Sequence, residues 1–228
     1  MPMPTRTDEA LLHLLQLASP ALPIGAFAYS QGLEYAAHAG WVRDEAGAGD
    51  WILGLLAHSL TALDIPVLAR LYLGWERDDQ AAVRRWSELL LAARESRELQ
   101  AQERQLGAAL ARLLADLDMP DASAWVTDTS VCHGAMFALA AARWRIPLAR
   151  AVLGYLWAWC ESQIAAVIKL VPLGQTAGQR ILSRAAAAIP RAAEQGLTVA
   201  DDHIGASAPG LAIASSRHET QYSRLFRS

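Results

Sequence analysis

The sequence has few cysteines and no large excess of either sign of charge. Its 228 residues include only Cys132 and Cys160, which are too few for a disulfide framework and suit a reducing cytosol. Twenty basic and 23 acidic residues give a formal net charge of −3. A chain with this charge has no general attraction to phosphate backbones. We therefore predict a cytoplasmic protein that has no nucleic-acid partner.

The sequence also lacks a clean targeting or membrane-spanning segment. Near its start, acidic and polar residues interrupt a small leucine cluster at residues 11–15, so the pattern of a signal peptide is not met. Residues 151–171 are long enough to span a bilayer, but Glu161 and Gln163 lie near the middle of this run. A carboxylate there costs roughly 2.5–3.5 kcal/mol on insertion. We interpret the run as a buried helix and predict no membrane contact.

Signatures of catalysis and of metal binding are missing as well. The chain has no Gly-x-Ser-x-Gly elbow, and its histidines are scattered. Gly174 and Gly178 suggest a phosphate-binding loop, but their spacing is one residue too short and Gln179 stands where a lysine is needed. Cys132 and His133 are adjacent, so on a helix they point about 100° apart. We expect no cofactor, no dedicated metal site and no nucleotide hydrolysis by this chain.

What the sequence does contain is a helical period. Apolar residues, which make up 53% of the chain, recur at 3.6-residue spacing, whereas sustained apolar/polar alternation is not found. Prolines, among them Pro66 and Pro190, are expected to separate the periodic runs. We predict an all-α fold, a single-domain bundle of about eight to ten helices with a flexible C-terminal tail.

Two of the expected helices differ in how they should be buried. Leucines between Leu99 and Leu117 form one apolar stripe, and charged residues that include Glu98 and Glu103 are available for the solvent side of that helix. Residues 148–171, by contrast, are apolar nearly all round. This pattern predicts a central helix that the other helices surround.

Two stretches interrupt this pattern within the body of the chain. Residues 17–34 contain the serine, prolines and glycine of a rigid connection, and Ser30 is placed to cap the helix that follows. Residues 168–180 begin in the last turn of the apolar helix, where the charge of Lys169 suits the helix dipole. Taken from the residues alone, both stretches favour a structural role.

The third unusual stretch is the C-terminal tail. Tyr222, Leu225 and Phe226 lie at helical spacing in it. A chain end of this kind is usually frayed, but it can become ordered when its apolar side chains enter a groove on a partner. We therefore divide the chain into a helical domain at residues 1–210 and a partner-binding tail at residues 211–228.

Taken together, the three stretches resemble the UreF family of urease accessory proteins. The resemblance is carried by three motifs, Leu-Ala-Ser-Pro-Ala-Leu-Pro-Ile-Gly-Ala-Phe at residues 17–27, Ile-Lys-Leu-Val-Pro-Leu-Gly-Gln-Thr-Ala-Gly-Gln-Arg at residues 168–180, and Arg-His-Glu-Thr-Gln-Tyr-Ser-Arg-Leu-Phe-Arg-Ser at residues 217–228. It extends from Leu11 to Ser228 and is weaker over residues 74–144. Ala28 and residues 160–163 depart mildly from the family pattern.

The resemblance implies a non-enzymatic scaffold for urease maturation. Such a protein dimerises, binds UreD (also called UreH), recruits the GTPase UreG and docks on apo-urease, and nickel passes through the assembly as cargo. Residues 217–228 would be the segment that UreD orders. The partner-binding residues that we infer in this way are Glu34, Lys169, Gly174, Gln175, Arg217, His218, Glu219, Tyr222, Arg224, Leu225 and Phe226.

Several roles stay open at this point. Two roles stay open for Lys169, a contact with the GTPase and stabilisation of the interior. Two also stay open for Glu34, lining a route for nickel and contacting a partner. An enzyme that uses Glu161 and Lys169 as an acid/base pair is a rival hypothesis, although a structural ion pair between them is favoured. Another is an activator that supplies one of three tail arginines to the GTPase, namely Arg217, Arg224 or Arg227.

Overall fold

The computed structural model describes residues 6–205 and 208–228, and all regular structure in these ranges is helical. The predicted all-α class is therefore confirmed. The α-helices of the described ranges are α1 (Arg6–Leu17), α2 (Leu33–His38), α3 (Glu45–Leu55), α4 (Ile65–Glu76), α5 (Gln80–Ala92), α6 (Arg97–Asp116), α7 (His133–Arg143), α8 (Leu148–Leu170), α9 (Gln175–Leu197) and α10 (Pro209–His218). Short 3₁₀ turns cover Ala26–Ala28, Pro120–Trp125 and Asp201–His203.

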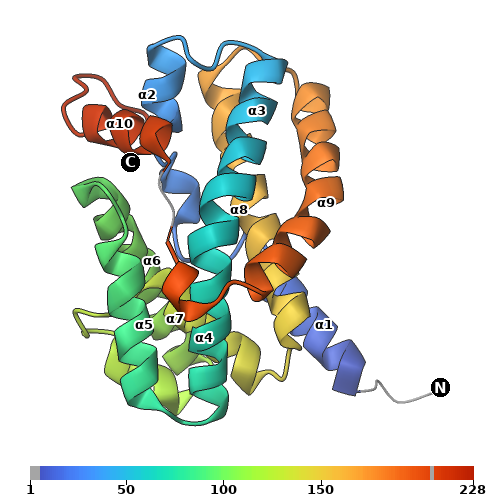
Figure 1. Ribbon diagram of the computed structural model, residues 1–228, viewed down its shortest axis with the longest axis vertical. Helices are drawn as coiled ribbons and strands as arrows, with labels where there is room; N and C mark the ends of the chain where they lie inside the picture. Colours follow the sequence, from blue (N-terminus) through green and yellow to red (C-terminus); the bar gives the residue numbers. More distant parts are fainter. Residues whose placement is uncertain (1–5, 206–207) are drawn as a thin grey trace.

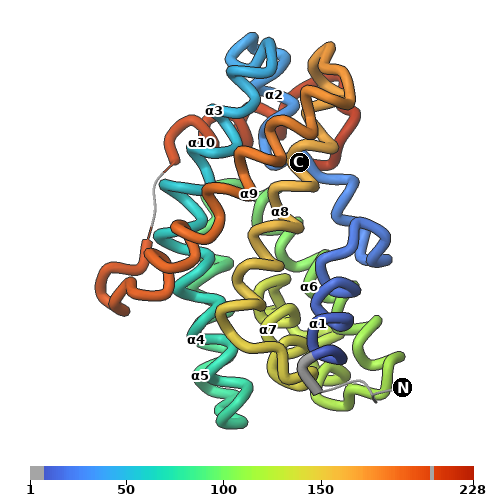
Figure 2. Tube along the Cα trace, turned by 90° about the vertical axis from the view of Figure 1, so that its right-hand side faces the viewer, coloured from blue at the N-terminus to red at the C-terminus, as the bar shows by residue number. Residues whose placement is uncertain are grey.

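Helix α8 passes through the middle of the bundle, as its apolar composition predicts. It packs against α1, α2, α3, α4, α7 and α9, and Figures 1 and 2 show these helices arranged around it. Behind it, α7 is buried on every side from Gly134 to Ala141. The two helices form the centre of one continuous hydrophobic core, which reaches as far as Phe226 in the tail.

Pro66 lies in the first turn of α4, a position that tolerates proline, but the helical path before it does not end there as expected. Helices α3 and α4 are joined by a π-helical segment, Leu56–Asp64, into one continuous run. A proline ring removes the hydrogen bond to the carbonyl four residues earlier, here that of Ala62. That carbonyl instead accepts a hydrogen bond from the backbone N–H of Gly205 at 3.0 Å, and Thr61 Oγ1 donates to the Leu56 carbonyl at 2.8 Å. The N–H of Gly205 thus replaces the hydrogen bond that the proline cannot make to Ala62.

The expectation for Pro190 is also wrong, because this residue lies inside α9. An interior proline costs a helix about 3 kcal/mol. Ile181 and Leu182 before the proline and Ile189 and Ala192 near it are buried in the core. Burying apolar side chains on both sides of the proline outweighs the local cost, since each large one contributes roughly 1.5–3 kcal/mol.

The apolar stripe of α6 is shifted from the predicted one. Leu99, Leu106 and Leu110 are buried as expected, whereas Leu117 lies beyond the end of the helix and is exposed. Glu103, expected on the solvent side, is buried. Its carboxylate is drawn inward by the guanidinium of Arg94, 2.6 Å away, and such a partner is what a buried charge requires.

Two helical stretches are long and apolar enough to cross a membrane by length and composition, residues 45–76 and 148–170. In the most apolar window of each, 72% and 56% respectively lie buried inside the structure. Both are therefore accounted for as helices of the hydrophobic core.

Helix α1 exposes part of its apolar surface. Ala10 and Leu17 are buried against the core, but Leu11, Leu12 and Leu15 are exposed by 50%, 64% and 60%. In Figure 1 the helix lies along the edge of the bundle, away from α10 and the C-terminus. Exposed leucines on successive turns are typical of a surface that another protein covers.

The close approach of α6 to the start of α7 gives a stability prediction. A Cβ on Gly107 in α6 would lie 2.5 Å from the carbonyl carbon of Cys132, whereas one on Gly54 in α3 would meet nothing within 4 Å. Gly107→Ala should lower the free energy of unfolding by about 1–3 kcal/mol through overpacking. Gly54→Ala should raise it by up to about 1 kcal/mol through helix propensity. Chemical denaturation of both variants tests this, and equal effects would contradict the packing described.

Candidate partner-binding site at the C-terminal tail

The tail folds back onto the body at the corner formed by α2, α6 and α10. Figure 1 shows the C-terminus just below α10, and α10 packs against both α2 and α6. The predicted boundary at residue 210 falls inside α10, so the helix itself carries the start of the tail. Gly32 permits the close approach, because it has a φ of +75° and a Cβ on it would lie 2.9 Å from the backbone nitrogen of Ser215.

Glu34 is the centre of this corner. It lies in the first turn of α2 and is 6% exposed. Its Oε1 accepts a hydrogen bond from the backbone N–H of Leu225 at 2.6 Å, and its Oε2 accepts one from that of Phe226 at 2.8 Å. The Nε2 atom of His218 lies 3.1 Å from the same Oε2. One buried carboxylate thus binds two residues of the tail and the last residue of α10.

A second carboxylate, that of Glu98 in the first turn of α6, faces the other side of the same histidine. Its Oε2 lies 2.6 Å from His218 Nδ1, and its Oε1 accepts a hydrogen bond from Arg224 Nη1 at 2.8 Å. The imidazole of His218 is completely buried between the two glutamates. Glu219 completes the corner by accepting the backbone N–H of Arg97 at 2.8 Å, a favourable place for a carboxylate at a helix N-terminus.

The last three residues contact the connection that precedes α2, together with side chains of α2, α6 and α8. The carbonyl of Ser228 accepts hydrogen bonds from the backbone N–H and the Oγ of Ser30, at 2.6 and 2.5 Å. Ser228 Oγ donates to Gln102 Oε1 at 2.8 Å. Phe226 is buried, and the ammonium of Lys169 lies 5.6 Å from the centre of its ring, within the range of a cation–π contact.

The structure therefore brings together most of the residues inferred from the sequence. Glu34, His218, Arg224, Leu225, Phe226 and Lys169 belong to one connected set of contacts. Gly174 and Gln175 lie at the exposed start of α9. In the described part of the chain, no hydrogen bond or ring contact joins these two residues to the tail.

The three expected apolar anchors of the tail do not behave alike. Tyr222 is fully exposed and Leu225 is 64% exposed, so both are available to a partner. Phe226 differs from the expectation, because its ring is buried against the body of its own chain. The reason is that its backbone N–H is bound to Glu34, which turns the side chain toward the core. Whether the tail is flexible stays a prediction.

The sequence analysis missed three residues of this corner. Glu98 was expected on the solvent side of its helix, and neither Gln102 nor Ser228 was singled out. Ser30 was expected to cap α2, but the N-cap residue of this helix is Gly32. The Oγ of Ser30 still accepts the backbone N–H of Glu34 in the first turn, at 3.2 Å. Its second bond, to a residue 198 positions away in the chain, leaves no trace in any local pattern.

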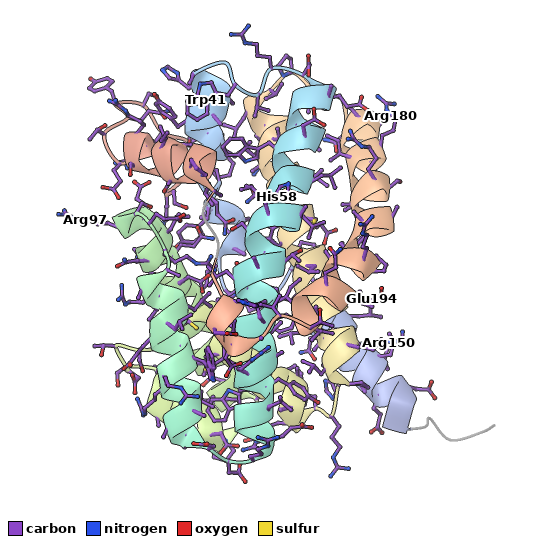
Figure 3. All side chains as sticks on the ribbon, viewed as in Figure 1. Trp41, His58, Arg97, Arg150, Arg180 and Glu194 are labelled. Carbon is purple, nitrogen blue, oxygen red and sulfur yellow. The ribbon has the colours of Figure 1, made fainter. Side chains whose placement is uncertain are left out.

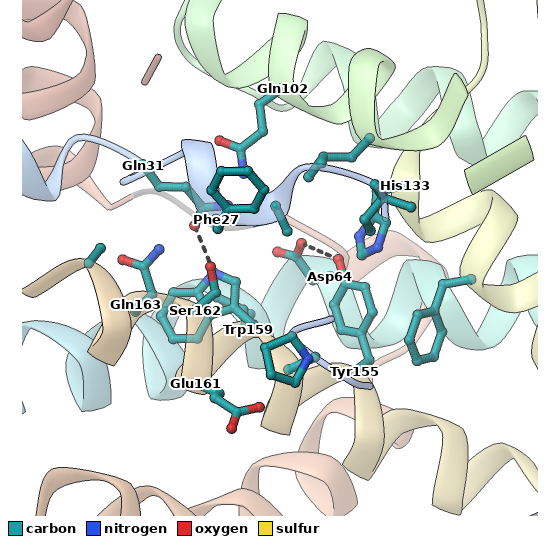
Figure 4. Close-up of a pocket in the computed structure, with 18 of the residues that line it drawn as sticks. Phe27, Gln31, Asp64, Gln102, His133, Tyr155, Trp159, Glu161, Ser162 and Gln163 are labelled. Carbon is teal, nitrogen blue, oxygen red and sulfur yellow. Dashed lines mark hydrogen bonds between the residues drawn. The ribbon is translucent and has the colours of Figure 1, made fainter. Parts of the chain in front are cut away.

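A cavity of about 160 Å³ lies beside the corner, between the 17–27 connection, α6 and α8. Figure 4 shows Glu161, Ser162 and Gln163 of α8 along its wall. Glu161 and Lys169 both line this cavity, and burial raises the pKa of Glu161. The ion pair expected between them does not form in the described chain, because the Lys169 ammonium lies over Phe226 instead. The acid/base hypothesis therefore lacks its contact.

The cavity ends on a buried ionic cluster. Arg94 Nη2 lies 2.5 Å from Asp64 Oδ1 and 2.6 Å from Glu103 Oε1, and Tyr155 donates a hydrogen bond to Asp64 (Figure 4). Burial opposes the charge of Arg94, but the two carboxylates hold its pKa well above the usual value. Burial lowers the pKa of His133 beside them. Because Arg94 pairs with both carboxylates, we interpret the cluster as a structural element.

Other features bear on the rival functions. Within residues 6–205 and 208–228, no three histidine, cysteine, aspartate or glutamate side chains gather where they could hold a metal ion. Of the arginines considered as fingers for a GTPase, Arg217 and Arg227 are exposed. Arg224 is bound to Glu98, so it would have to leave this partner before it could act in trans.

Comparison with known proteins decides the family. The UreF family model matches residues 42–186. The urease accessory protein UreF of Alkalilimnicola ehrlichii is 55% identical over 228 residues, covering 99% of this chain and 100% of the relative. This chain belongs to the UreF family. The family members of Pseudomonas putida strain W619 (50% identity over 222 residues; 97% and 99% covered) and Chromohalobacter salexigens (46% over 227 residues; 100% and 98% covered) are also similar.

The extent of these matches matters for the site. The UreF model ends at residue 186 and so does not reach α10 or the tail. The alignments with the UreF relatives span almost the whole chain, so they include Glu34 and the docked tail. These relatives are named accessory proteins, which agrees with the expectation that this UreF member is not an enzyme.

The ionic cluster generates the second prediction. Arg94→Met would leave the buried carboxylates of Asp64 and Glu103 without a positively charged partner, so it should lower the free energy of unfolding by about 3–5 kcal/mol. Arg180 in α9 offers the matched control, because its ion pair with Glu45 lies on the surface (Figure 3). Arg180→Met should leave the denaturation midpoint unchanged. Similar midpoints for the two variants would show that the buried cluster does not support the fold.

Proposed function

We propose that this chain is a non-enzymatic scaffold for urease maturation that binds UreD through its C-terminal tail. The observation that carries the proposal is that the backbone of the tail is held in place while two of its apolar side chains are exposed. Buried Glu34 fixes the backbone at Leu225 and Phe226, while Tyr222 and Leu225 project from the surface. A fixed backbone with exposed apolar side chains is suited to protein recognition, because little conformational entropy is lost on binding.

The surface around the tail fits such a contact. Ile213 on α10 is 51% exposed, and Trp41, just after α2, is 46% exposed. Figure 3 places Trp41 at the end of the bundle next to α10. Aromatic and arginine side chains are enriched among the residues that dominate binding energy. Arg217 and Arg224, both exposed, would add polar contacts at the edge of this surface.

We assign the contact with the GTPase UreG to a different exposed region, the connection between α8 and α9. Lys169, Gly174 and Gln175 are exposed there. A scaffold with no catalytic group can still regulate a GTPase, because binding one of its states more tightly shifts the equilibrium toward that state. The ammonium of Lys169 also lies over the ring of Phe226. Through this contact, binding of one partner at the connection would affect binding of another partner at the tail.

The remaining parts of the proposal concern the assembly as a whole. The protein would act in the cytoplasm, dock on apo-urease and pass nickel as cargo without holding it in a site of its own. A homodimer would cover part of the exposed apolar surface, and the leucines of α1, namely Leu11, Leu12 and Leu15, offer the kind of face that such a contact needs.

The third prediction tests the role of the tail. Leu225→Asp should abolish co-purification with UreD, because a charge replaces an apolar side chain at the centre of the contact. Removal of residues 217–228 should abolish it as well, together with nickel-dependent urease activation in cells. Because Leu225 is exposed, its substitution should not change the thermal stability of the free chain, which circular dichroism checks.

The matched control is Leu117→Asp. Leu117 is also exposed, at 44%, and it follows the end of α6 that is distant from the tail, since a helix of this length spans about 30 Å. This variant should bind UreD like the parent chain. If Leu225→Asp binds UreD normally, the tail is not the recognition segment and the contact must lie on the helical body.

A further inference from the structure

His218 is the one histidine in the described chain whose imidazole ring lies between two carboxylates. Its Nε2 lies 3.1 Å from Glu34 Oε2, and its Nδ1 lies 2.6 Å from Glu98 Oε2. The ring is completely buried, and the carboxyl groups are nearly so. No water can easily replace either partner in such a position, so the protonation of the three groups must satisfy both contacts at once.

The two contacts fix the number of protons in the cluster. A neutral imidazole carries one N–H and has one acceptor nitrogen, whereas a carboxylate only accepts. A neutral histidine can therefore donate to only one of two ionised glutamates. Forming both hydrogen bonds requires one additional proton. The count is the same whether the extra proton sits on the ring or on a glutamate. The closed tail thus contains one proton that the free groups lack near pH 8.

The neighbours of the cluster favour placing that proton on the ring. Glu34 also accepts the backbone N–H groups of Leu225 and Phe226, and Glu98 also binds the guanidinium of Arg224. Both sets of donors stabilise the ionised carboxylate. All of these donors bind an ionised carboxylate when the two glutamates are charged and the ring between them is an imidazolium ion.

The other titratable groups near the corner have partners of their own. On the tail, Glu219 accepts the backbone N–H of Arg97. On α2, Tyr35 and His38 face each other with ring centres 6.4 Å apart. From α8, Lys169 lies over the ring of Phe226. On α6, Glu103 is paired with Arg94. Within the described chain, the groups that contact the His218 ring are therefore the two glutamates.

We propose that His218, Glu34 and Glu98 form a proton-operated latch that holds the tail on the body. Closing the tail takes up one proton when the open tail carries a neutral histidine. By linkage, the state that binds more protons is favoured at lower pH. Because the closed tail holds one proton more than the open tail, the ratio of closed to open tail falls as the pH rises, by up to about tenfold per pH unit.

The latch controls which surface a partner meets. In the closed state the backbone at Leu225 and Phe226 is fixed, and Tyr222 is presented from a defined place. In the open state the Glu34 carboxylate is hydrated and Phe226 leaves the core. The inference concerns the free chain, so it stands or falls independently of any contact with UreD.

Hydrogen exchange on the full-length chain tests the latch directly. The protection factor of the amides of residues 225 and 226, measured between pH 5.5 and 9 and corrected for the intrinsic exchange rate at each pH, should fall by up to about tenfold per unit above pH 7. A peptide from α7 in the same samples controls for global unfolding. Nitrogen NMR of ¹⁵N-histidine-labelled chain should show both ring nitrogens of His218 protonated at pH 6.

Two variants separate a proton latch from an ordinary structural contact. In Glu98→Gln the amide can donate to the Nδ1 of a neutral ring, so the tail should remain protected at pH 6 while the pH dependence largely disappears. In His203→Gln, which changes an exposed histidine outside the tail, the pH dependence should be unchanged. Protection in the wild-type chain that stays constant from pH 6 to pH 9 would overturn the proposal.

Discussion

A carboxylate that is taken out of water must find donors for its lone pairs, and Glu34 finds all of them in one segment of its own chain. Two backbone N–H groups and one imidazole nitrogen, contributed by the last helix and the tail, surround it. The buried charge and the folded tail therefore depend on each other, because an unpaired carboxylate at this depth would cost several kcal/mol. Electrostatic contacts hold the tail together with the burial of Phe226, since Tyr222 and Leu225 stay outside.

The same constraint explains why the proposed recognition surface and the contacts that hold the tail lie at one corner. Residues from α2, α6, α8 and α10 contribute to a single set of contacts that ends at Lys169 and Phe226. Membership in the UreF family gives this corner a biological setting, the maturation of urease. A scaffold needs surfaces that are fixed in the free protein and yet can be altered by a partner. A segment held by a few buried polar contacts has both properties, because such contacts are strong when complete and costly when broken.

The helices could be predicted from the sequence, but the polar contacts between them could not. Val83, Trp86 and Leu90 follow the helical period and are buried as it predicts, because periodicity reports directly on which face of a helix meets the core. Glu103 was misplaced because its partner, Arg94, comes from outside its helix. Glu34 and His218 are 184 positions apart in the chain, and no local pattern records such a pair. The residues carried over from the family resemblance did include both. Glu98 lies in the stretch Arg-Glu-Ser-Arg-Glu-Leu at residues 94–99, which also resembles the family, but its contact with His218 was found only in the structure.

The measurement that tests the central role of Glu34 most directly is a double-mutant cycle on UreD affinity. Glu34 is buried, so in this account it acts on the partner only through the tail. Glu34→Gln in the full chain should weaken UreD binding at least about tenfold. In a chain that ends at Ser216, whose binding is too weak for co-purification and is measured by titration at high UreD concentration, the same substitution should change the affinity no further, because coupled residues are not additive. Equal losses in both backgrounds would contradict the account, since Glu34 would then contribute to binding independently of the tail that it holds.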